Sequence, residues 1–260
     1  MFLPENGHAD RQNGHVPAVA KAFRLLDLLS TSPEPLGVSE LSRRLGMGKS
    51  TIHGLVTTLR SFGAVEPVDG AKRYRIGRGL HALAMRSAGR VDLRSIARPS
   101  LERLAAQTEQ SSFLGVVADD HVTILDLVHG KPAMSVSAPV GSTIPLLAGA
   151  VGKAVLSAWD PARRADFLHA KPLPKFTLKT VADPAAYEEA VQQTIARGVA
   201  LDVDEYVDGM RAAAAPVIDA SGQLAAVIWI AAFARHIDDA ALADAAVAVS
   251  REAHEIARSL

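Results

Sequence analysis

The sequence predicts an α+β protein: a winged helix-turn-helix, a helical linker, and a second domain with an antiparallel sheet. Three observations support this fold class. Residues 36–65 hold two short helical patterns separated by a glycine, and a basic hairpin pattern follows them. From residue 111 onward, strand-like and helix-like runs are mixed without strict alternation.

The first helix is expected over residues 17–30, after a polar, turn-rich stretch at residues 1–15 that we expect to be disordered. A proline at position 17 suits the first turn of a helix. The helical period predicts a core-facing stripe of Val19, Phe23, Leu26 and Leu29.

A helix-turn-helix is predicted next. Its first helix is expected to start near Ser39 as N-cap and to pack through Leu41 and Leu45, and Gly46 supplies the turn. The second helix has an apolar stripe at helical period, formed by Ile52, Leu55, Val56 and Leu59. Its opposite face carries hydrogen-bonding or basic groups and no carboxylate, as a helix lying in a DNA groove requires: Lys49, Ser50, His53 and Thr57.

The wing is predicted from two short extended runs joined by an Asp69-Gly70 turn. In the second run Tyr74 and Ile76 alternate with Arg73 and Arg75, so one face is apolar and the other cationic. The alternative is an ordinary solvated hairpin beside a small helical bundle. A basic wing directly after a helix-turn-helix favours DNA binding over that alternative.

Composition supports two domains with different tasks. The 260 residues carry no net charge, yet residues 1–95 hold 14 basic against 8 acidic side chains, and residues 96–260 hold 14 against 20. A basic amino-terminal part suits nucleic acid, and the acidic remainder does not. Cysteine is absent, and no apolar run approaches the ~20 residues of a membrane span, so we expect a cytoplasmic protein.

In the remainder, helices are expected up to Gly89 and over 92–107, with a kink or break at Pro99. Three strand-like runs (112–120, 121–130 and 132–140) predict an antiparallel meander. The later pattern predicts helices at 151–158, 161–169 and 184–197, strands at 212–218 and 224–232, and a final helix from Asp238.

Two features of the second domain are candidates for ligand chemistry. A helix starting at Gly149–Gly152 would present free N–H groups to a ligand carboxylate, although the same residues also suit a plain strand-to-helix turn. Asp202 lies in an acidic cluster and could accept a hydrogen bond from a ligand, while Arg211 is expected to pair within that cluster. The histidines have no metal-ligand spacing, and Gly48-Lys49-Ser50 lacks the upstream glycine of a phosphate loop.

The chain resembles the IclR family of bacterial transcriptional regulators nearly end to end. The resemblance is carried by ordered motifs: AFRLLDLLS, VSELSRRLGMGKSTIHGLVTTL, YRIGRGL, ARPSLERLAAQT, GKAVLS, LPKFT and DVDEYVDGMRAAAAPVIDASG. It implies a winged helix-turn-helix at 16–78, a linker helix at 79–95 and a GAF-like effector domain at 96–260. It also implies a homodimer or a homotetramer built as a dimer of dimers.

The resemblance also implies an effector pocket, which we assign to Gly149, Ala150, Val151, Asp202 and Ala212. Relatives commonly have a large basic residue at the position of Gly54, and a cysteine at that of Ala212. They carry polar residues before GKA, where this chain reads LLAGAV. We therefore expect a more apolar pocket here.

The sequence thus predicts a ligand-responsive transcription factor, a repressor or activator, that binds an inverted-repeat operator and senses a small carboxylic or aromatic acid. The DNA-binding residues we assign are Arg43, Arg44, Lys49, Ser50, Thr51, His53, Arg60, Arg73 and Arg75. No cofactor, metal or membrane is expected. The rival hypothesis, an enzyme for a small organic acid with an accessory DNA-binding module, lacks a nucleophile motif or paired carboxylates.

Overall fold

The computed structural model describes residues 16–260 except 69, 71, 89–91, 132–134 and 171. The expected disordered tail at 1–15 lies outside the described residues. The chain divides into two compact units, residues 1–90 and 91–260. This division falls inside the range 79–95 predicted for the linker. No helix in the described ranges is long and apolar enough to cross a membrane.

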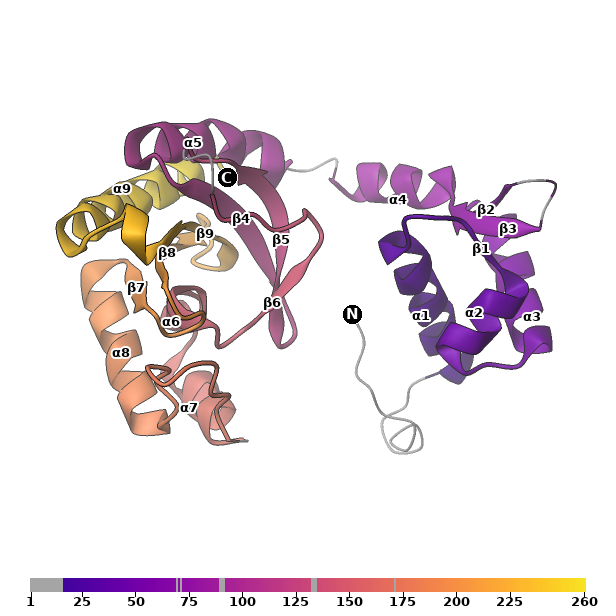
Figure 1. Cartoon of the computed structure of the whole chain (residues 1–260), viewed down its shortest axis with the longest axis horizontal. Coiled ribbons are helices and arrows are strands. Elements are labelled where there is room, and N and C mark those ends of the chain that lie inside the picture. The colour runs from indigo at the N-terminus through magenta and orange to yellow at the C-terminus, as the bar shows by residue number, and fades with distance from the viewer. Residues whose placement is uncertain (1–15, 69, 71, 89–91, 132–134, 171) are drawn as a thin grey trace. The chain divides into compact units, whose positions relative to one another are not determined.

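The described residues of the first unit form helices and a small sheet (Figure 1). Helices α1 (Pro17–Thr31), α2 (Val38–Leu45) and α3 (Lys49–Ser61) surround a core that includes Leu25, Leu41, Ile52 and Val56. Strands β1 (Leu36–Gly37), β2 (Val65–Val68) and β3 (Arg73–Ile76) form an antiparallel sheet in the order β1-β3-β2, and α4 (Arg78–Ala88) follows. The helix-turn-helix with its wing is confirmed.

Two details of this unit differ from the expectation. Val19 and Phe23 are 52% and 61% exposed, so this part of the predicted stripe is wrong, whereas Leu29 is buried as predicted and Leu26 packs partly buried against the core. Leu25, which was not predicted, is also buried. Helix α2 is preceded by Gly37 in an extended conformation, so Ser39 is not its N-cap. Gly46 ends α2 with φ of +64°, as predicted. Asp69 of the predicted wing turn lies outside the described residues.

The second unit is built on a six-stranded antiparallel sheet in the order β6-β5-β4-β9-β8-β7. The strands are β4 (Ser111–Ala118), β5 (His121–Val128), β6 (Thr143–Pro145), β7 (Ala200–Val203), β8 (Met210–Ile218) and β9 (Leu224–Phe233). Helices α5 (Leu93–Thr108) and α9 (Asp239–Ala257) cover one face, while α6 (Gly149–Ser157), α7 (Pro161–His169) and α8 (Pro184–Arg197) lie on the other (Figure 1).

Alternation along the strands divides the core into two layers. Leu114, Ile228 and Ile230 face α5 and α9, whereas Phe113, Val227 and Trp229 face α6 and α8. Successive buried residues of the central strands therefore point alternately to the two helical layers. The second layer contains the cavity described below.

The structure of this unit differs from the expectations at three places. The run 132–140 is not a strand where it is described: residues 135–139 belong to no strand, and Thr143–Pro145 pairs with β5 instead. Helix α5 continues through Pro99 without a break. Strand β7 was not predicted, because four residues beside an acidic loop give too short an alternation to recognise.

Candidate functional site

The residues assigned to DNA binding lie on α2, α3 and β3 of the first unit and are exposed. Ile52 and Val56 of α3 are buried in the core, and the opposite side of the helix faces solvent. All the side chains assigned to DNA binding are exposed: Arg43, Arg44, Lys49, Ser50, Thr51, His53, Arg60, Arg73 and Arg75. The first turn of α3 has no acidic residue. This half of the molecule therefore offers hydrogen-bonding and cationic groups to a polyanion.

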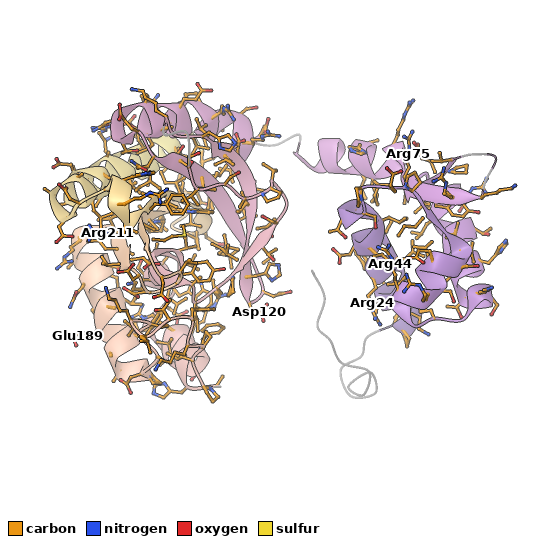
Figure 2. The ribbon with its side chains drawn as sticks, viewed as in Figure 1. Arg24, Arg44, Arg75, Asp120, Glu189 and Arg211 are labelled. Carbon is orange, nitrogen blue, oxygen red and sulfur yellow. The ribbon has the colours of Figure 1, made fainter. Side chains whose placement is uncertain are left out.

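Several of these cations are paired within the unit, which the sequence interpretation missed. Glu40 accepts hydrogen bonds from Arg43 Nη2 at 2.6 Å and from Arg44 Nε at 2.5 Å, and these bonds lower the pKa of Glu40. Arg75, which extends outward from the hairpin in Figure 2, donates to Glu66 at 2.7 Å. The signal was available: Glu40 stands three and four residues before the two arginines.

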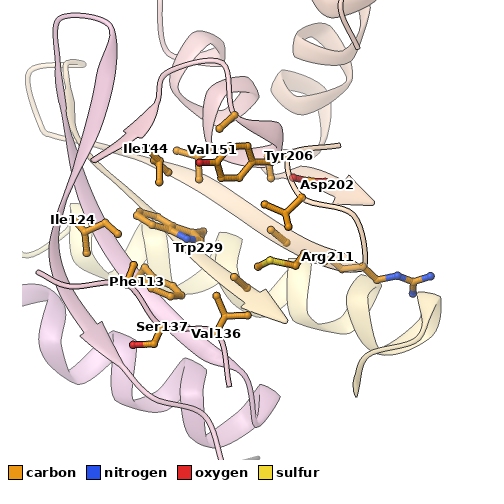
Figure 3. A pocket seen from close by; sticks show the side chains of 17 residues that line it. Phe113, Ile124, Val136, Ser137, Ile144, Val151, Asp202, Tyr206, Arg211 and Trp229 are labelled. Carbon is orange, nitrogen blue, oxygen red and sulfur yellow. The ribbon is translucent and has the colours of Figure 1, made fainter. Parts of the chain in front are cut away.

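A cavity of about 230 Å³ lies in the second unit between the sheet and α6. Its walls come from β4, β5, β8 and β9, from residues 136–138, from the start of α6 and from the turn at 202–207. Phe113 and Trp229 stack in its floor with ring centroids 5.1 Å apart and planes at 4°, and Tyr206 lies near the start of α6 (Figure 3). Of the predicted effector residues, Ala150, Val151, Asp202 and Ala212 line it, and Gly149 does not.

Gly149 instead lies directly against Asp202. A Cβ on Gly149 would be 1.8 Å from Asp202 Oδ2, and its φ of +48° also favours glycine. Asp202 is 6% exposed, and its Oδ1 accepts a hydrogen bond from the Glu205 amide at 2.7 Å. The carboxylate therefore faces the amino-terminal end of α6, where unpaired N–H groups and the helix dipole favour an anion.

Burial raises the pKa of Asp202 to about 6, and the nearby Glu205 carboxylate adds to this effect. Lys153 on α6 acts in the opposite direction, but its Nζ donates to Glu205 Oε1 at 2.6 Å and to the Leu201 carbonyl. Tyr187 of α8 is buried beside them, and its hydroxyl has no hydrogen-bond partner among the described residues. The acidic cluster is thus a buried network at Asp202 and Glu205, not a solvated loop.

Arg211 lines the cavity, and its buried Nε has no hydrogen-bond partner among the described residues. Its Nη1 donates to the Ile237 carbonyl at 3.0 Å and to Asp239 at 2.8 Å, and Figure 3 shows the guanidinium directed away from the aromatic floor. The expected pairing of Arg211 within the acidic cluster is therefore wrong. The sequence separation of Arg211 and Asp239 left no short-range signal for this pair.

The turn that carries Tyr206 is clamped by a second loop. Thr180 Oγ1 donates to the Glu205 carbonyl at 2.6 Å and accepts from the Phe176 and Thr177 amides. Thr177 Oγ1 donates to the Asp204 carbonyl at 2.7 Å, and the rings of Phe176 and Tyr206 meet edge to face. These contacts fix one wall of the cavity. The sequence interpretation had assigned no role to either threonine.

Comparison with known proteins identifies the chain. The family described as IclR helix-turn-helix domain matches residues 18–69, and that described as Bacterial transcriptional regulator IclR C-terminal matches residues 85–258. The chain belongs to the IclR family. It is a DNA-binding transcriptional regulator and not an enzyme, so the rival hypothesis of an organic-acid enzyme is set aside.

Relatives from several bacteria share most of the length of this IclR-family chain. The regulator BhcR of Paracoccus denitrificans is 33% identical over 252 residues, 95% of this chain and 89% of its own. The regulator XynR of Escherichia coli is 28% identical over 88% of this chain and 91% of its own. The crystal structure of an Alicyclobacillus acidocaldarius IclR regulator superposes with a TM-score of 0.79 at 25% identity, covering 94% of this chain and 98% of that one.

Proposed function

We propose that this regulator is a homodimer, or a dimer of dimers, that binds an inverted-repeat operator with α3 in the major groove. The observation that carries the proposal is the division of α3 into a buried face and an exposed face of Lys49, Ser50, Thr51 and His53. Short hydrogen-bonding side chains at the start of such a helix read base edges. Two-fold pairing sets the two helices about 34 Å apart, or a multiple of that distance.

The arginines contribute more to the overall affinity for DNA than to discrimination between base sequences. Arg43, Arg44 and Arg60 flank the reading helix, and Arg73 and Arg75 extend from the wing toward the DNA backbone or minor groove. The Arg43–Glu40 ion pair is exposed to solvent and therefore weak, so a phosphate can replace the carboxylate at little cost. Binding should therefore weaken steeply with salt.

The apolar face of α1 supports self-association. Val16, Val19 and Phe23 are all more than half exposed, although they are large apolar side chains on one helix. Exposed apolar patches of this kind mark surfaces that another protein covers. A second copy of the chain is the occupant we propose, because a two-fold operator requires two reading helices.

The cavity supports an effector site for a small organic molecule, a carboxylic or aromatic acid, contacted by Ala150, Val151, Asp202 and Ala212 and shaped by Gly149. Its lining is mostly apolar, with few polar groups, as ligand pockets typically are. An IclR homologue from Microbacterium hydrocarbonoxydans with the same fold was crystallised with 4-hydroxybenzoate. The effector represses or activates by binding more tightly to one relative arrangement of the two helix-turn-helix units than to another. The resulting change in the free energy of DNA binding is typically 1–3 kcal/mol. Such a regulator acts in the cytoplasm, where the chromosome lies.

The experiment is a fluorescence-anisotropy competition between a fragment of the protein's own promoter and a scrambled fragment. Lys49→Ala with His53→Ala should remove the preference for the promoter and retain non-specific binding. The matched control, Lys175→Ala with His169→Ala, removes the same side-chain types from exposed positions of the second unit. Unchanged preference in the α3 double variant would refute the assignment.

A further inference from the structure

A buried carboxylate on β5 lies outside the cavity and is held by two arginines. Asp126 is 1% exposed, and the amide of Leu127 donates to its Oδ1 at 2.9 Å. Arg98 Nη1 donates to both carboxylate oxygens, at 3.2 and 3.3 Å, and Arg94 Nη2 lies 3.4 Å from Oδ1. A carboxylate that has lost its water needs such partners to stay ionised.

A β-bulge turns Asp126 toward α5. Asp126 lies opposite Leu114 of β4, and the next residue of β4 lies opposite Ile124, so Leu125 is left over as an extra residue. In a regular strand, residues 124 and 126 would point to the same face. Because of the bulge, Ile124 lines the cavity, whereas Asp126 meets the arginines of α5. One short segment of β5 therefore contacts both the cavity and α5.

Both arginines lie in the first two turns of α5, the helix that opens the second unit. This unit begins at residue 91, directly after the DNA-binding unit. Helix α5 packs on β4 and β5 (Figure 1), and its first residues Leu93 and Ile96 contact the core. Apolar contacts have no direction and would let this helix end slide, whereas hydrogen bonds to a fixed carboxylate hold it in one orientation.

A similar ion pair holds the other end of α5. Arg103 Nη2 donates to Glu252 of α9 at 2.6 Å, and Glu252 is 2% exposed. The side chains of Arg98 and Arg103 are 43% and 52% exposed. The two pairs share their chemistry, a half-exposed arginine on a buried carboxylate, but only the Asp126 pair lies at the end of α5 that follows the DNA-binding unit.

We propose that Asp126 is a positioning residue: with Arg94 and Arg98 it fixes the start of α5 on the sheet, and thereby restricts the two units to arrangements that bind the operator. The inference deepens the proposed function, in which the second unit controls DNA binding, and it rests on that function. Apparent affinity falls in proportion to the fraction of molecules in the binding arrangement. Loosening the start of α5 should therefore weaken operator binding without changing the reading face of α3.

The test compares Arg98→Ala with Arg103→Ala in the full chain. Both variants remove a half-exposed arginine from a buried carboxylate, so both should lose stability to a similar degree. The chain has no cysteine, so Thr58→Cys on α3 and Glu189→Cys on α8 give two unique exposed sites for spin labels. Doubly labelled chains are diluted with an excess of unlabelled chains, and pulsed electron paramagnetic resonance measures the distance distribution between the labels of one chain.

We expect Arg98→Ala to broaden this distribution by at least half of the wild-type width, and Arg103→Ala to match the wild type. Arg98→Lys, which keeps a cation beside Asp126, should restore most of the wild-type width. If Arg98→Ala failed to fold, Arg94→Ala would provide the same comparison. An unchanged width without the arginine, or equal broadening in Arg103→Ala, would overturn the inference.

Fluorescence anisotropy of the unlabelled proteins separates this inference from the proposed function. Arg98→Ala should bind the promoter fragment about fivefold more weakly than the wild type, and a scrambled duplex equally well. Equal promoter affinities for Arg98→Ala and Arg103→Ala would overturn the inference and leave the regulator assignment standing. A wild-type protein without preference for its promoter would instead refute the proposed function, and the distance distributions would still decide whether Asp126 positions α5.

Discussion

Gly149 and Asp202 lie so close that no side chain fits between them: a Cβ on Gly149 would be 1.8 Å from Asp202 Oδ2. We predict that Gly149→Ala lowers the free energy of unfolding by more than about 2 kcal/mol, because positive φ and the steric contact both oppose alanine. Gly222→Ala is the control. Its φ of +81° carries the backbone cost, but a Cβ there meets nothing within 4 Å. If urea unfolding showed equal losses of unfolding free energy for Gly149→Ala and Gly222→Ala, the steric contact with Asp202 would be unimportant.

Asp202→Asn should change how stability depends on pH. The folded state holds the Asp202 proton up to a pKa of about 6, and the unfolded chain releases it near 3.8. The contribution of Asp202 to stability is therefore present at low pH and is lost as the pH rises from about 4 to about 6, by roughly 3 kcal/mol. In urea titrations from pH 4 to pH 8, the free energy of unfolding of the variant should rise relative to that of the wild type between about pH 4 and about pH 6. A constant difference across the range would contradict the burial argument.

The clamp on the cavity wall gives a prediction at Thr180. Thr180→Val keeps the shape but leaves the Phe176 and Thr177 amides and the Glu205 carbonyl without this partner. We expect a loss of about 1–3 kcal/mol in the free energy of unfolding and weaker ligand binding, because the turn with Tyr206 loosens. Thr58→Val, exposed on α3, is the control for the substitution itself. A Thr180→Val protein with wild-type stability would exclude the clamp.

Gly54 stands on α3 where the family resemblance implies a large basic residue in relatives. A Cβ on Gly54 would meet nothing within 4 Å, and its backbone is helical. Gly54→Ala should raise the free energy of unfolding by about 1 kcal/mol. Gly54→Arg should add a phosphate contact, which steepens the slope of log affinity against log salt by about one. Calorimetry measures the unfolding free energy of Gly54→Ala, and fluorescence anisotropy at several salt concentrations measures the salt slope of Gly54→Arg. An unchanged slope would show that residue 54 lies away from DNA.

The exposed face of α1 should control assembly. Phe23→Glu places a charge in the proposed interface, so the protein should sediment as a smaller species than the wild type at equal concentration. Leu178→Glu removes an apolar side chain that is 91% exposed in the second unit, and its sedimentation should match the wild type. If Phe23→Glu retained the wild-type species, the interface would lie elsewhere.

The sequence predicted the periodic elements well, because their patterns are local. Helix α3, the alternation of Tyr74 with Arg73 and Arg75, and the helix end at Gly46 were found where expected. The error at Val19 and Phe23 has a physical reason: apolar residues surround much of α1, so the helical period alone does not choose the face, and packing buries Leu25 and Leu29 instead.

The cavity was predicted less completely, because it is assembled from distant segments. The resemblance supplied Ala150, Val151, Asp202 and Ala212, whereas nothing in the sequence marked Phe113 and Trp229 as stacked neighbours. They meet because β4 pairs with β9 in a register that places Phe113 opposite Trp229. The Arg211–Asp239 ion pair likewise depends on where α9 begins beside β8.

The most direct test measures how tightly the purified full-length protein binds its own promoter fragment, against a scrambled duplex of equal length, over a range of salt concentrations. A ligand-responsive regulator should prefer the promoter by at least a thousandfold near physiological salt, an order-of-magnitude figure for specific binding. Its affinity should also shift when a small molecule fills the cavity. Equal affinity for both duplexes at every salt concentration would contradict the central claim.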